Sequence, residues 1–510
     1  MLFLGAGVFF ATNALSRVTD VVPAQGGTYV EGVVGQPSFI NPLFVGSNDA
    51  DRDLVEILFR DMLSLSESTK VHTDGKTWTL RLRERAMWDD GAPVTSDDII
   101  FTIEAIQNPD ARSPLFSAWQ GIRTERISER EVKLTLPGPY AFFEDQLRDL
   151  RPLPQHLFKT IPVANFRISN YVLEPVGNGP FRFSTFDKKK NGFITRYTLV
   201  PNEHYFGEPP YLSEFVFRFY SDQDSLLQDF NSGALDGVGG LSYEDANRLL
   251  LRHQTFSLSM PRYYAVFFNQ FTHPALKDSG VRAALQFALN KEDIIQKVFS
   301  GSAFSVRGPL LPAMRGYNEA LYPRDEFSPE KAAALLDARG WKLRDGETVR
   351  IHDTSQEALS LELVVPRTNA FLMKTAELIR ASWEPLGVSV AIKALSSSEI
   401  SEVITTRNYQ MLLFGNVFGR STDLYSFWHS SERFYPGLNL SLYENKTVDG
   451  LIESVRKTMQ QDKRTRDWET LQTSLIRDLP ALFLYSPHYY YVTKQREEGF
   501  RETYLPLASD

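Results

Sequence analysis

Two pairs of adjacent carboxylates, Asp89-Asp90 and Asp97-Asp98, are the first candidates for chemistry in this sequence. Two carboxyl groups that face each other across a cleft carry out glycoside hydrolysis, one as the acid and the other as base or nucleophile. However, Asp90 precedes a glycine, as in a tight turn, and Asp97 and Asp98 stand where the first turn of a helix favours acidic side chains. We therefore expect structural roles for both pairs and no catalytic residue.

The motifs that hold phosphates, dinucleotides and metals are incomplete. The single Gly-Lys pair begins at Gly75, and a phosphate-binding loop would need another glycine where Lys70 stands. Gly177 and Gly179 lack the third glycine of a dinucleotide fingerprint. The eight histidines show no His-x-x-x-His spacing, and the absence of cysteine excludes thiolate catalysis, cysteine-bound zinc and a lipidated cysteine. We expect no cofactor and no metal site.

Length, charge and hydropathy limit the class of protein. A chain of 510 residues corresponds to about three domains, and 42% hydrophobic residues are enough for large cores. A net charge of −8 without a long basic run argues against nucleic acid as a partner. Residues 2–11 are mostly apolar, a length too short to span a bilayer but typical of the hydrophobic part of a signal peptide. We expect an exported chain whose residues 1–26 are a membrane anchor or a signal segment. Because the chain has no cysteine to carry a lipid, we favour the uncleaved anchor over a signal that is removed.

The apolar residues recur at the periods of a mixed α/β protein. Alternation predicts strands over 28–34, 76–83, 131–136, 179–185, 194–200, 214–220 and 263–269. Helical spacing predicts helices over 49–65, 95–106, 280–298 and 328–338. The order of strand 361–365, helix 373–383 and strand 388–392 is typical of an α/β lobe. Because no low-complexity linker interrupts the chain, we expect the lobes to be joined by strands that cross between them.

Four segments carry a specific resemblance. They read Trp-Asp-Asp-Gly-Ala-Pro-Val-Thr at 88–95, Gly-Asn-Gly-Pro-Phe at 177–181, Val-Arg-Ala-Ala-Leu at 281–285 and Asp-Leu-Tyr-Ser-Phe-Trp-His-Ser at 423–430. In this order they resemble the family 5 extracellular solute-binding proteins, the oligopeptide- and dipeptide-binding components of ABC importers. The resemblance covers roughly residues 27–500.

The resemblance implies a fold and a function. The fold would be mixed α/β and two-lobed, of the class II periplasmic-binding-protein type, with an extra inserted domain and a hinge between the lobes. After an N-terminal segment (1–26), domain I would comprise 27–52, 171–258 and 487–510, domain II would be the insertion 53–170, and domain III would be 259–486. The protein would be a monomeric binding protein rather than an enzyme. It would capture peptides between domains I and III by hinge closure and deliver them to an ABC permease and its ATPase.

The resemblance also indicates which side chains would meet the ligand, each with a structural alternative as a turn, core or hinge residue. These are Phe39, Asn41, Trp119, Asn269, Asn416, Phe418, Arg420, Asp423 and Trp428. Peptide-binding members place an Asp in this region to pair with the α-ammonium of the ligand, but the matching position here is Phe418, with Arg420 nearby. Either Asp423 takes that role from a shifted position, or the ligand lacks a free amine there.

Other interpretations stay open at the level of sequence. The chain would alternatively be a cell-surface hydrolase of the glycosidase type, or a peptide receptor or chaperone without a transport role. The ligand would alternatively be an oligosaccharide or a metal chelate. In each case we expect the protein outside the cytoplasm, in the periplasm or at the cell surface, tethered to the cytoplasmic membrane by residues 1–26.

Overall fold

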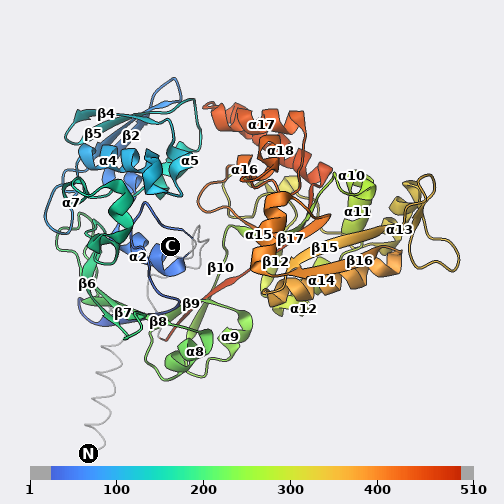
Figure 1. The fold of residues 1–510 in the computed structure, drawn as a ribbon, viewed down its shortest axis with the longest axis horizontal. Helices are drawn as coiled ribbons and strands as arrows, with labels where there is room; N and C mark the ends of the chain where they lie inside the picture. Colours follow the sequence, from blue (N-terminus) through green and yellow to red (C-terminus); the bar gives the residue numbers. More distant parts are fainter. Residues whose placement is uncertain (1–23, 47, 495–510) are drawn as a thin grey trace, which may run out of the picture.

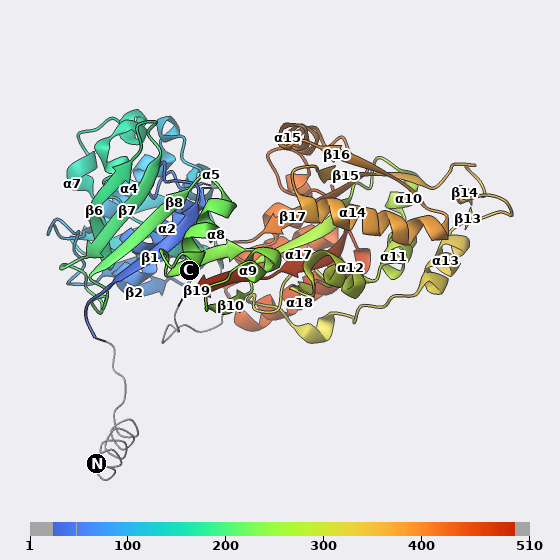
Figure 2. The same ribbon diagram turned by 90° about the horizontal axis from the view of Figure 1, so that it is seen from below.

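The computed structural model describes residues 24–46 and 48–494, which form two lobes placed side by side (Figures 1 and 2). Residues 1–23 of the predicted anchor and residues 495–510 of the predicted domain I lie outside the described residues. A bilayer-spanning helix is absent from residues 24–46 and 48–494. Three larger sheets of seven, four and six strands organise the lobes.

The seven-stranded sheet brings together parts of the chain that are far apart in sequence. Its order is β10-β19-β9-β1-β8-β7-β6. The bounds are β1 (Thr28–Val34), β6 (Phe181–Lys188), β7 (Ile194–Pro201), β8 (Glu214–Tyr220), β9 (Gly237–Leu241), β10 (Gln254–Leu258) and β19 (Tyr489–Thr493). Helices α8 (Gln223–Asn231) and α9 (Tyr243–Asn247) pack against the β9 and β19 side of this sheet.

The four-stranded sheet lies within a single stretch of chain, in the order β2-β3-β5-β4. Its strands are β2 (Ser66–Val71), β3 (Thr77–Leu82), β4 (Arg123–Ser128) and β5 (Glu131–Thr135). The helices around it are α2 (Asp49–Leu58), α3 (Met62–Leu65), α4 (Ser96–Gln107), α5 (Phe116–Trp119), α6 (Phe143–Asp149) and α7 (Gln155–Phe158). One continuous hydrophobic core holds Leu80 of this sheet together with Leu199 of the seven-stranded sheet. The two sheets therefore belong to one lobe.

The second lobe is built on the six-stranded sheet, in the order β12-β18-β11-β17-β15-β16. The bounds are β11 (Arg262–Phe268), β12 (Ala303–Ser305), β15 (Ser360–Pro366), β16 (Ser389–Leu395), β17 (Met411–Val417) and β18 (Ala481–Pro487). Strands β15 and β16 are parallel and α14 (Ala370–Trp383) connects them, which confirms the predicted strand–helix–strand unit. A separate two-stranded ribbon consists of β13 (Trp341–Lys342) and β14 (Ile351–His352).

Each face of the six-stranded sheet has its own core, because successive side chains of a strand point to opposite faces. Along β11, Val266 and Phe268 enter one core, and Ala265 and Phe267 enter the other. The first core is covered by α10 (Pro274–Lys277), α11 (Ser279–Phe287), α12 (Lys291–Phe299), α13 (Pro329–Ala338) and α14. The second is covered by α15 (Ser397–Thr406), α16 (Tyr425–Trp428), α17 (Lys446–Lys457) and α18 (Gln461–Asp478).

The chain crosses from the seven-stranded to the six-stranded sheet between β10 and β11, and it crosses back between β18 and β19 (Figure 2). These crossings agree with the expectation of lobes joined by strands. The three-domain division stays a prediction. It is supported by the sheets, because the strands of each larger sheet fall within the ranges proposed for one domain, except that β18 ends at Pro487, one residue beyond the range proposed for domain III.

Two predicted helices are broken in the structure. The helix expected over 49–65 ends at Leu58, because its carbonyl accepts hydrogen bonds from the backbone of Asn178 and Gly179. A Cβ on Gly177 would lie 2.1 Å from the Leu58 oxygen, so glycine is what permits this approach. The helix expected over 280–298 is split into α11 and α12, because the Asn290 side chain caps the second.

Candidate functional site

A pocket of about 250 Å³ lies between the two lobes. Its first-lobe wall comes from the loop after β1, including Pro42, and from α2, including Glu56. Its second-lobe wall is the segment that follows β17, from Phe418 to Ser421. The structure thus brings the predicted residues Phe418 and Arg420 to the loop that contains the predicted Asn41.

Charged side chains from both lobes meet in this pocket. The Arg420 guanidinium lies 3.3 Å from a carboxylate oxygen of Glu56 and 3.3 Å from one of Asp149. Glu56 also pairs with the buried Arg151. Because Arg420 stands on the second lobe and its partners stand on the first, these ion pairs form only when the lobes are in contact.

A second pocket, of about 480 Å³, is lined by residues 414–417 at the end of β17, which directly precede the residues 418–421 that line the first pocket. It lies at the carboxyl ends of the parallel strands β15, β16 and β17, the edge of a parallel sheet where ligands characteristically bind. The predicted Asn416 is in its wall, with 4% of its surface exposed, and its amide donates to the Tyr263 hydroxyl over 3.0 Å. Phe418 is anchored at the junction, since its ring packs against Tyr263 and Phe427 and its backbone N–H donates to Pro261.

Asp423 is held by three donors. One carboxylate oxygen accepts from the Tyr140 hydroxyl and from Arg456 Nε, both over 2.9 Å, and the other accepts from the Tyr425 backbone N–H over 3.0 Å. Tyr140 belongs to the first lobe and Arg456 to α17 of the second. Burial and the Asp423 charge raise the pKa of Tyr140, so this phenol keeps its proton and donates it. In this arrangement Asp423 links the lobes.

The neighbours of Tyr140 reinforce the same contact. The Ala141 backbone N–H donates to the Arg456 carbonyl over 2.7 Å. The Phe142 ring lies 5.8 Å from the Trp468 ring and belongs to a hydrophobic core of the second lobe. The segment of three residues after β5 thus extends from the first lobe into the second. We call residues 140–142 the interlobe contact segment.

The loop after β1 is fixed by the carboxylate of Asp51, which accepts from the backbone of Ser38 and Phe39. The predicted Phe39 is partly buried, with the Arg167 guanidinium 5.3 Å from its ring centre. The predicted Asn41 is 1% exposed, and its Oδ1 accepts from the Leu43 backbone. Its buried Nδ2 has no hydrogen-bond partner among the described residues.

Of the nine predicted residues, only Asn416, Phe418 and Arg420 line these pockets. Besides Phe39, Asn41 and Asp423, described above, three others lie outside both pockets. Trp119 is 2% exposed and packs on Phe143 in the core of the first lobe. Trp428 is fully buried against Phe483 in the second lobe. Asn269 lies at the end of β11 opposite to the Tyr263 and Asn416 pair, and its amide donates to the carbonyls of residues 407 and 409. In these surroundings Trp119 and Trp428 are core residues, and Asn269 holds the loop before β17. These are the structural alternatives that the sequence left open for them.

The sequence did not single out several acidic residues near the lobe boundary. Burial raises the pKa of Glu31, in β1, to about 8, and its carboxylate accepts from the Tyr491 hydroxyl. Burial raises the pKa of Asp53, in α2, to about 7. Strongly shifted carboxyl groups gather at functional sites. The sequence feature that could have indicated Glu31 is its position, an acidic residue at the centre of an otherwise mostly apolar strand.

The carboxylate pairs Asp89-Asp90 and Asp97-Asp98 have structural partners. Asp89 accepts from the Gly177 backbone, Asp90 contacts the His156 ring, and Asp97 pairs with Arg126. Asp98 accepts from the backbone N–H of Thr95, the N-cap of α4. These contacts agree with the structural roles predicted for all four.

Comparisons with known proteins place the chain. A family model for "Bacterial extracellular solute-binding proteins, family 5 Middle" matches residues 63–434. The oligopeptide-binding protein AppA of Bacillus subtilis (strain 168) is 24% identical over 509 residues, covering 96% of this chain and 92% of AppA. The nickel-binding periplasmic protein of Escherichia coli (strain K12) is 25% identical over 464 residues, covering 88% of this chain and 84% of that protein.

Comparison of the fold with solved structures also finds a solute-binding protein. The ABC transporter substrate-binding protein CtaP of Listeria monocytogenes has a crystal structure that matches with a TM-score of 0.81 at 22% identity, covering 95% of this chain and 99% of that one. The two-lobed fold of the periplasmic binding proteins is therefore confirmed. The relatives are binding components of ABC transporters, not enzymes. The chain belongs to family 5 of the bacterial extracellular solute-binding proteins of ABC importers.

Proposed function

We propose that this protein captures short peptides between its lobes, closes around them and delivers them to an ABC permease and its ATPase. The observation that carries the proposal is the pocket between the lobes, where Arg420 of one lobe meets Glu56 of the other. A ligand in this pocket touches both lobes, so its binding favours the arrangement in which the lobes are in contact. The two strand crossings would act as the hinge.

The second pocket supports an extended ligand. The pockets of about 250 and 480 Å³ are lined by the consecutive stretches 418–421 and 414–417, and together they offer room for consecutive residues of a peptide. An extended peptide must satisfy its backbone N–H and C=O groups when it is buried, and loop backbone and side-chain amides such as Asn416 supply partners. AppA, named as an oligopeptide-binding protein, supports the same class of ligand.

A second candidate ligand is a metal chelate. The segment that would face a peptide amine contains Phe418 and Arg420, and Asp423 is already paired with Arg456. No group of three or more His, Asp or Glu in residues 24–46 and 48–494 is placed to hold a metal ion. A metal would therefore arrive with its own ligands, whose carboxylates Arg420 and Arg151 would bind. The nickel-binding relative favours this candidate.

The two candidates are separated by the ligand that the purified protein carries. Mass spectrometry of the released ligand would identify peptides or chelates, and calorimetry would compare a tripeptide, its N-acetylated form, and nickel with and without histidine. We expect the free tripeptide to bind. Preference for the chelate, with no peptide bound, would overturn the peptide assignment and leave the binding-protein assignment intact.

We also propose that the protein acts outside the cytoplasm as a monomer, anchored by residues 1–26. The extracellular setting is that of the family, and the apolar stretch 2–11 supports the anchor. Fractionation of cells that express the full chain or the chain from residue 27 tests the anchor. The full chain should sediment with membranes and the shortened one should not, while the mass of the detergent-free shortened chain by light scattering tests the monomer.

A further inference from the structure

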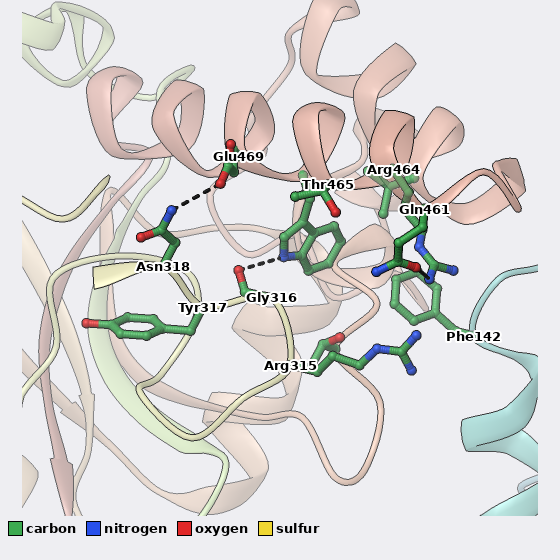
Figure 3. Close-up of a pocket in the computed structure, with 12 residues that line it drawn as sticks. Phe142, Arg315, Gly316, Tyr317, Asn318, Gln461, Arg464, Thr465 and Glu469 are labelled. Atoms are coloured by element: carbon green, nitrogen blue, oxygen red, sulfur yellow. Dashed lines mark hydrogen bonds between the residues drawn. The ribbon is translucent and has the colours of Figure 1, made fainter. Parts of the chain in front are cut away.

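A third pocket, of about 360 Å³, lies where the interlobe contact segment enters the second lobe (Figure 3). Its walls are Phe142 of the first lobe, the loop 315–318, and the first half of α18 with Trp468. It shares no lining residue with the two pockets assigned above to the transported solute. It is therefore a separate cavity that still has a wall from each lobe.

One end of this pocket is cationic. Figure 3 shows Arg315 and Arg464 together at the end next to Phe142. Neither guanidinium has a carboxylate within 4.0 Å among residues 24–46 and 48–494, and Arg464 donates only to the Gln461 side chain, over 2.7 Å. Burial, followed by the charge of Arg315, lowers the pKa of Arg464. Two positive charges thus oppose each other without a direct counter-charge.

The acidic side chains around this pocket leave that end open. Glu469 accepts from the Asn318 amide over 3.0 Å, and Figure 3 shows this pair at the opposite end. Asp145, on α6 of the first lobe, interacts electrostatically with both arginines but stays outside ion-pair distance. Burial raises the pKa of Asp145, with the charge of Arg315 acting against this rise.

We propose that this pocket is a second binding site, which takes a small organic carboxylate. The planar guanidinium groups of Arg315 and Arg464 match a carboxylate in geometry and charge. The rings of Phe142, Tyr317 and Trp468 line the rest of the cavity and accommodate an apolar body. The volume lies within the range of small-molecule sites.

The location gives this site a consequence for the lobes. Phe142 comes from the first lobe, and the arginines come from the second. A carboxylate held between them contacts both lobes, so its binding stabilises the arrangement in which they meet. The site thus adjusts closure from a position outside the pockets for the transported solute.

The experiment uses benzoate, succinate and citrate as probes and benzamide as the neutral analogue of benzoate. Affinities are measured by calorimetry at constant ionic strength on the wild-type chain and on the double variant Arg315→Gln, Arg464→Gln. Arg466→Gln is the matched control, because it lies on the same helix, is exposed and is outside the pocket. At least one carboxylate should bind the wild type and the control, and bind the double variant at least tenfold more weakly, while benzamide should not bind.

A variant of Asp145 separates this site from a simple contact between lobes. Asp145→Asn removes a negative charge that a bound carboxylate would face, so the affinity for the carboxylate probes should rise. If the two arginines serve only to attract Asp145, the variant will weaken the contact between lobes and no probe will bind. Failure of all three probes on the wild type, or equal binding to the double variant, refutes the site.

Discussion

Replacing Tyr140 with Phe removes one hydroxyl from the contact between the lobes. In the structure this hydroxyl donates to a carboxylate oxygen of Asp423 over 2.9 Å, and that same Asp423 oxygen also accepts from Arg456 Nε. The Asp423 side chain is 14% exposed, so water replaces the lost donor poorly. When the lobes separate, water replaces the Tyr140 hydroxyl beside Asp423, so the open form of the wild type and that of the variant differ little. The substitution therefore acts on the closed arrangement alone.

The size of the effect follows from the charge of the acceptor. A hydrogen bond to an ionised group contributes about 1.5–3 kcal/mol, and we take the lower end because Arg456 remains paired with Asp423. A change of about 1.4 kcal/mol is a factor of ten in an equilibrium constant. We expect the population of closed over open molecules to fall about tenfold. Ligand affinity should weaken by up to the same factor, depending on how closed the free protein is.

The absence of cysteine makes the assay direct, since two introduced cysteines carry the only labels. Lys189→Cys lies at the exposed tip of the β6–β7 hairpin in the first lobe, and Asp345→Cys lies in an exposed loop of the second. Energy transfer between dyes at these positions reports the open and closed populations. Calorimetry with the identified solute measures its affinity on the unlabelled proteins.

The control is Tyr211→Phe, which removes an exposed phenol of the first lobe. Asp423→Asn and the double variant with Tyr140→Phe complete a cycle that isolates the coupling between the two residues. An unchanged distance distribution and affinity in Tyr140→Phe would refute the assignment of Asp423 as a link between lobes. A loss of affinity in Asp423→Asn that Tyr140→Phe does not share would instead restore Asp423 as a direct partner of the ligand.

Three further substitutions test the remaining assignments. Trp428→Ala should lower the free energy of unfolding, measured by urea denaturation, by about 3–5 kcal/mol, and Asn269→Ala should lower it by about 1–3 kcal/mol. The ligand affinity of both folded variants should be unchanged. A large loss of affinity would instead make the substituted residue part of the binding site. The pKa of Glu31 is raised to about 8 in the folded protein. Between about pH 4.5 and pH 8 the native state therefore keeps a proton that the unfolded state has lost. The free energy of unfolding then falls as the pH rises, by up to about 1.4 kcal/mol per pH unit. Glu31→Gln should flatten this slope between pH 5 and 8, and an unchanged slope would show that Glu31 does not titrate there.

Local patterns predicted much of the fold. The strand predicted over 28–34 has the observed bounds of β1, and the N-cap at Thr95 is present. Such features depend on alternation and on hydrogen bonds within a few residues, which neighbouring side chains decide. The prediction of one helix over 49–65 was wrong, because the helix ends at Leu58. The Leu58 carbonyl accepts from the backbone of a turn more than a hundred residues away, and the side chain of Asn178 in that turn accepts from the Arg60 backbone N–H.

The candidate site divides in the same way. Segment order identified the family, and with it the loop after β1 and the segment around Phe418 and Arg420 as sides of one pocket. For Trp119 and Trp428 the sequence left open a core role beside a wall of the ligand site, because a large aromatic side chain suits both. The burial of each ring depends on the packing of distant elements.

The sequence by itself determined the mixed α/β class, the family and the absence of cysteine chemistry, since these follow from composition, from short-range periodicity and from the order of motifs. Only the tertiary structure decided what the charged residues do. Asp423 and Tyr140 are 283 residues apart, and Arg420 and Glu56 are 364 apart. Hydrogen bonds and ion pairs act over a few ångströms, so their partners are set by how the two lobes pack and not by their spacing along the chain.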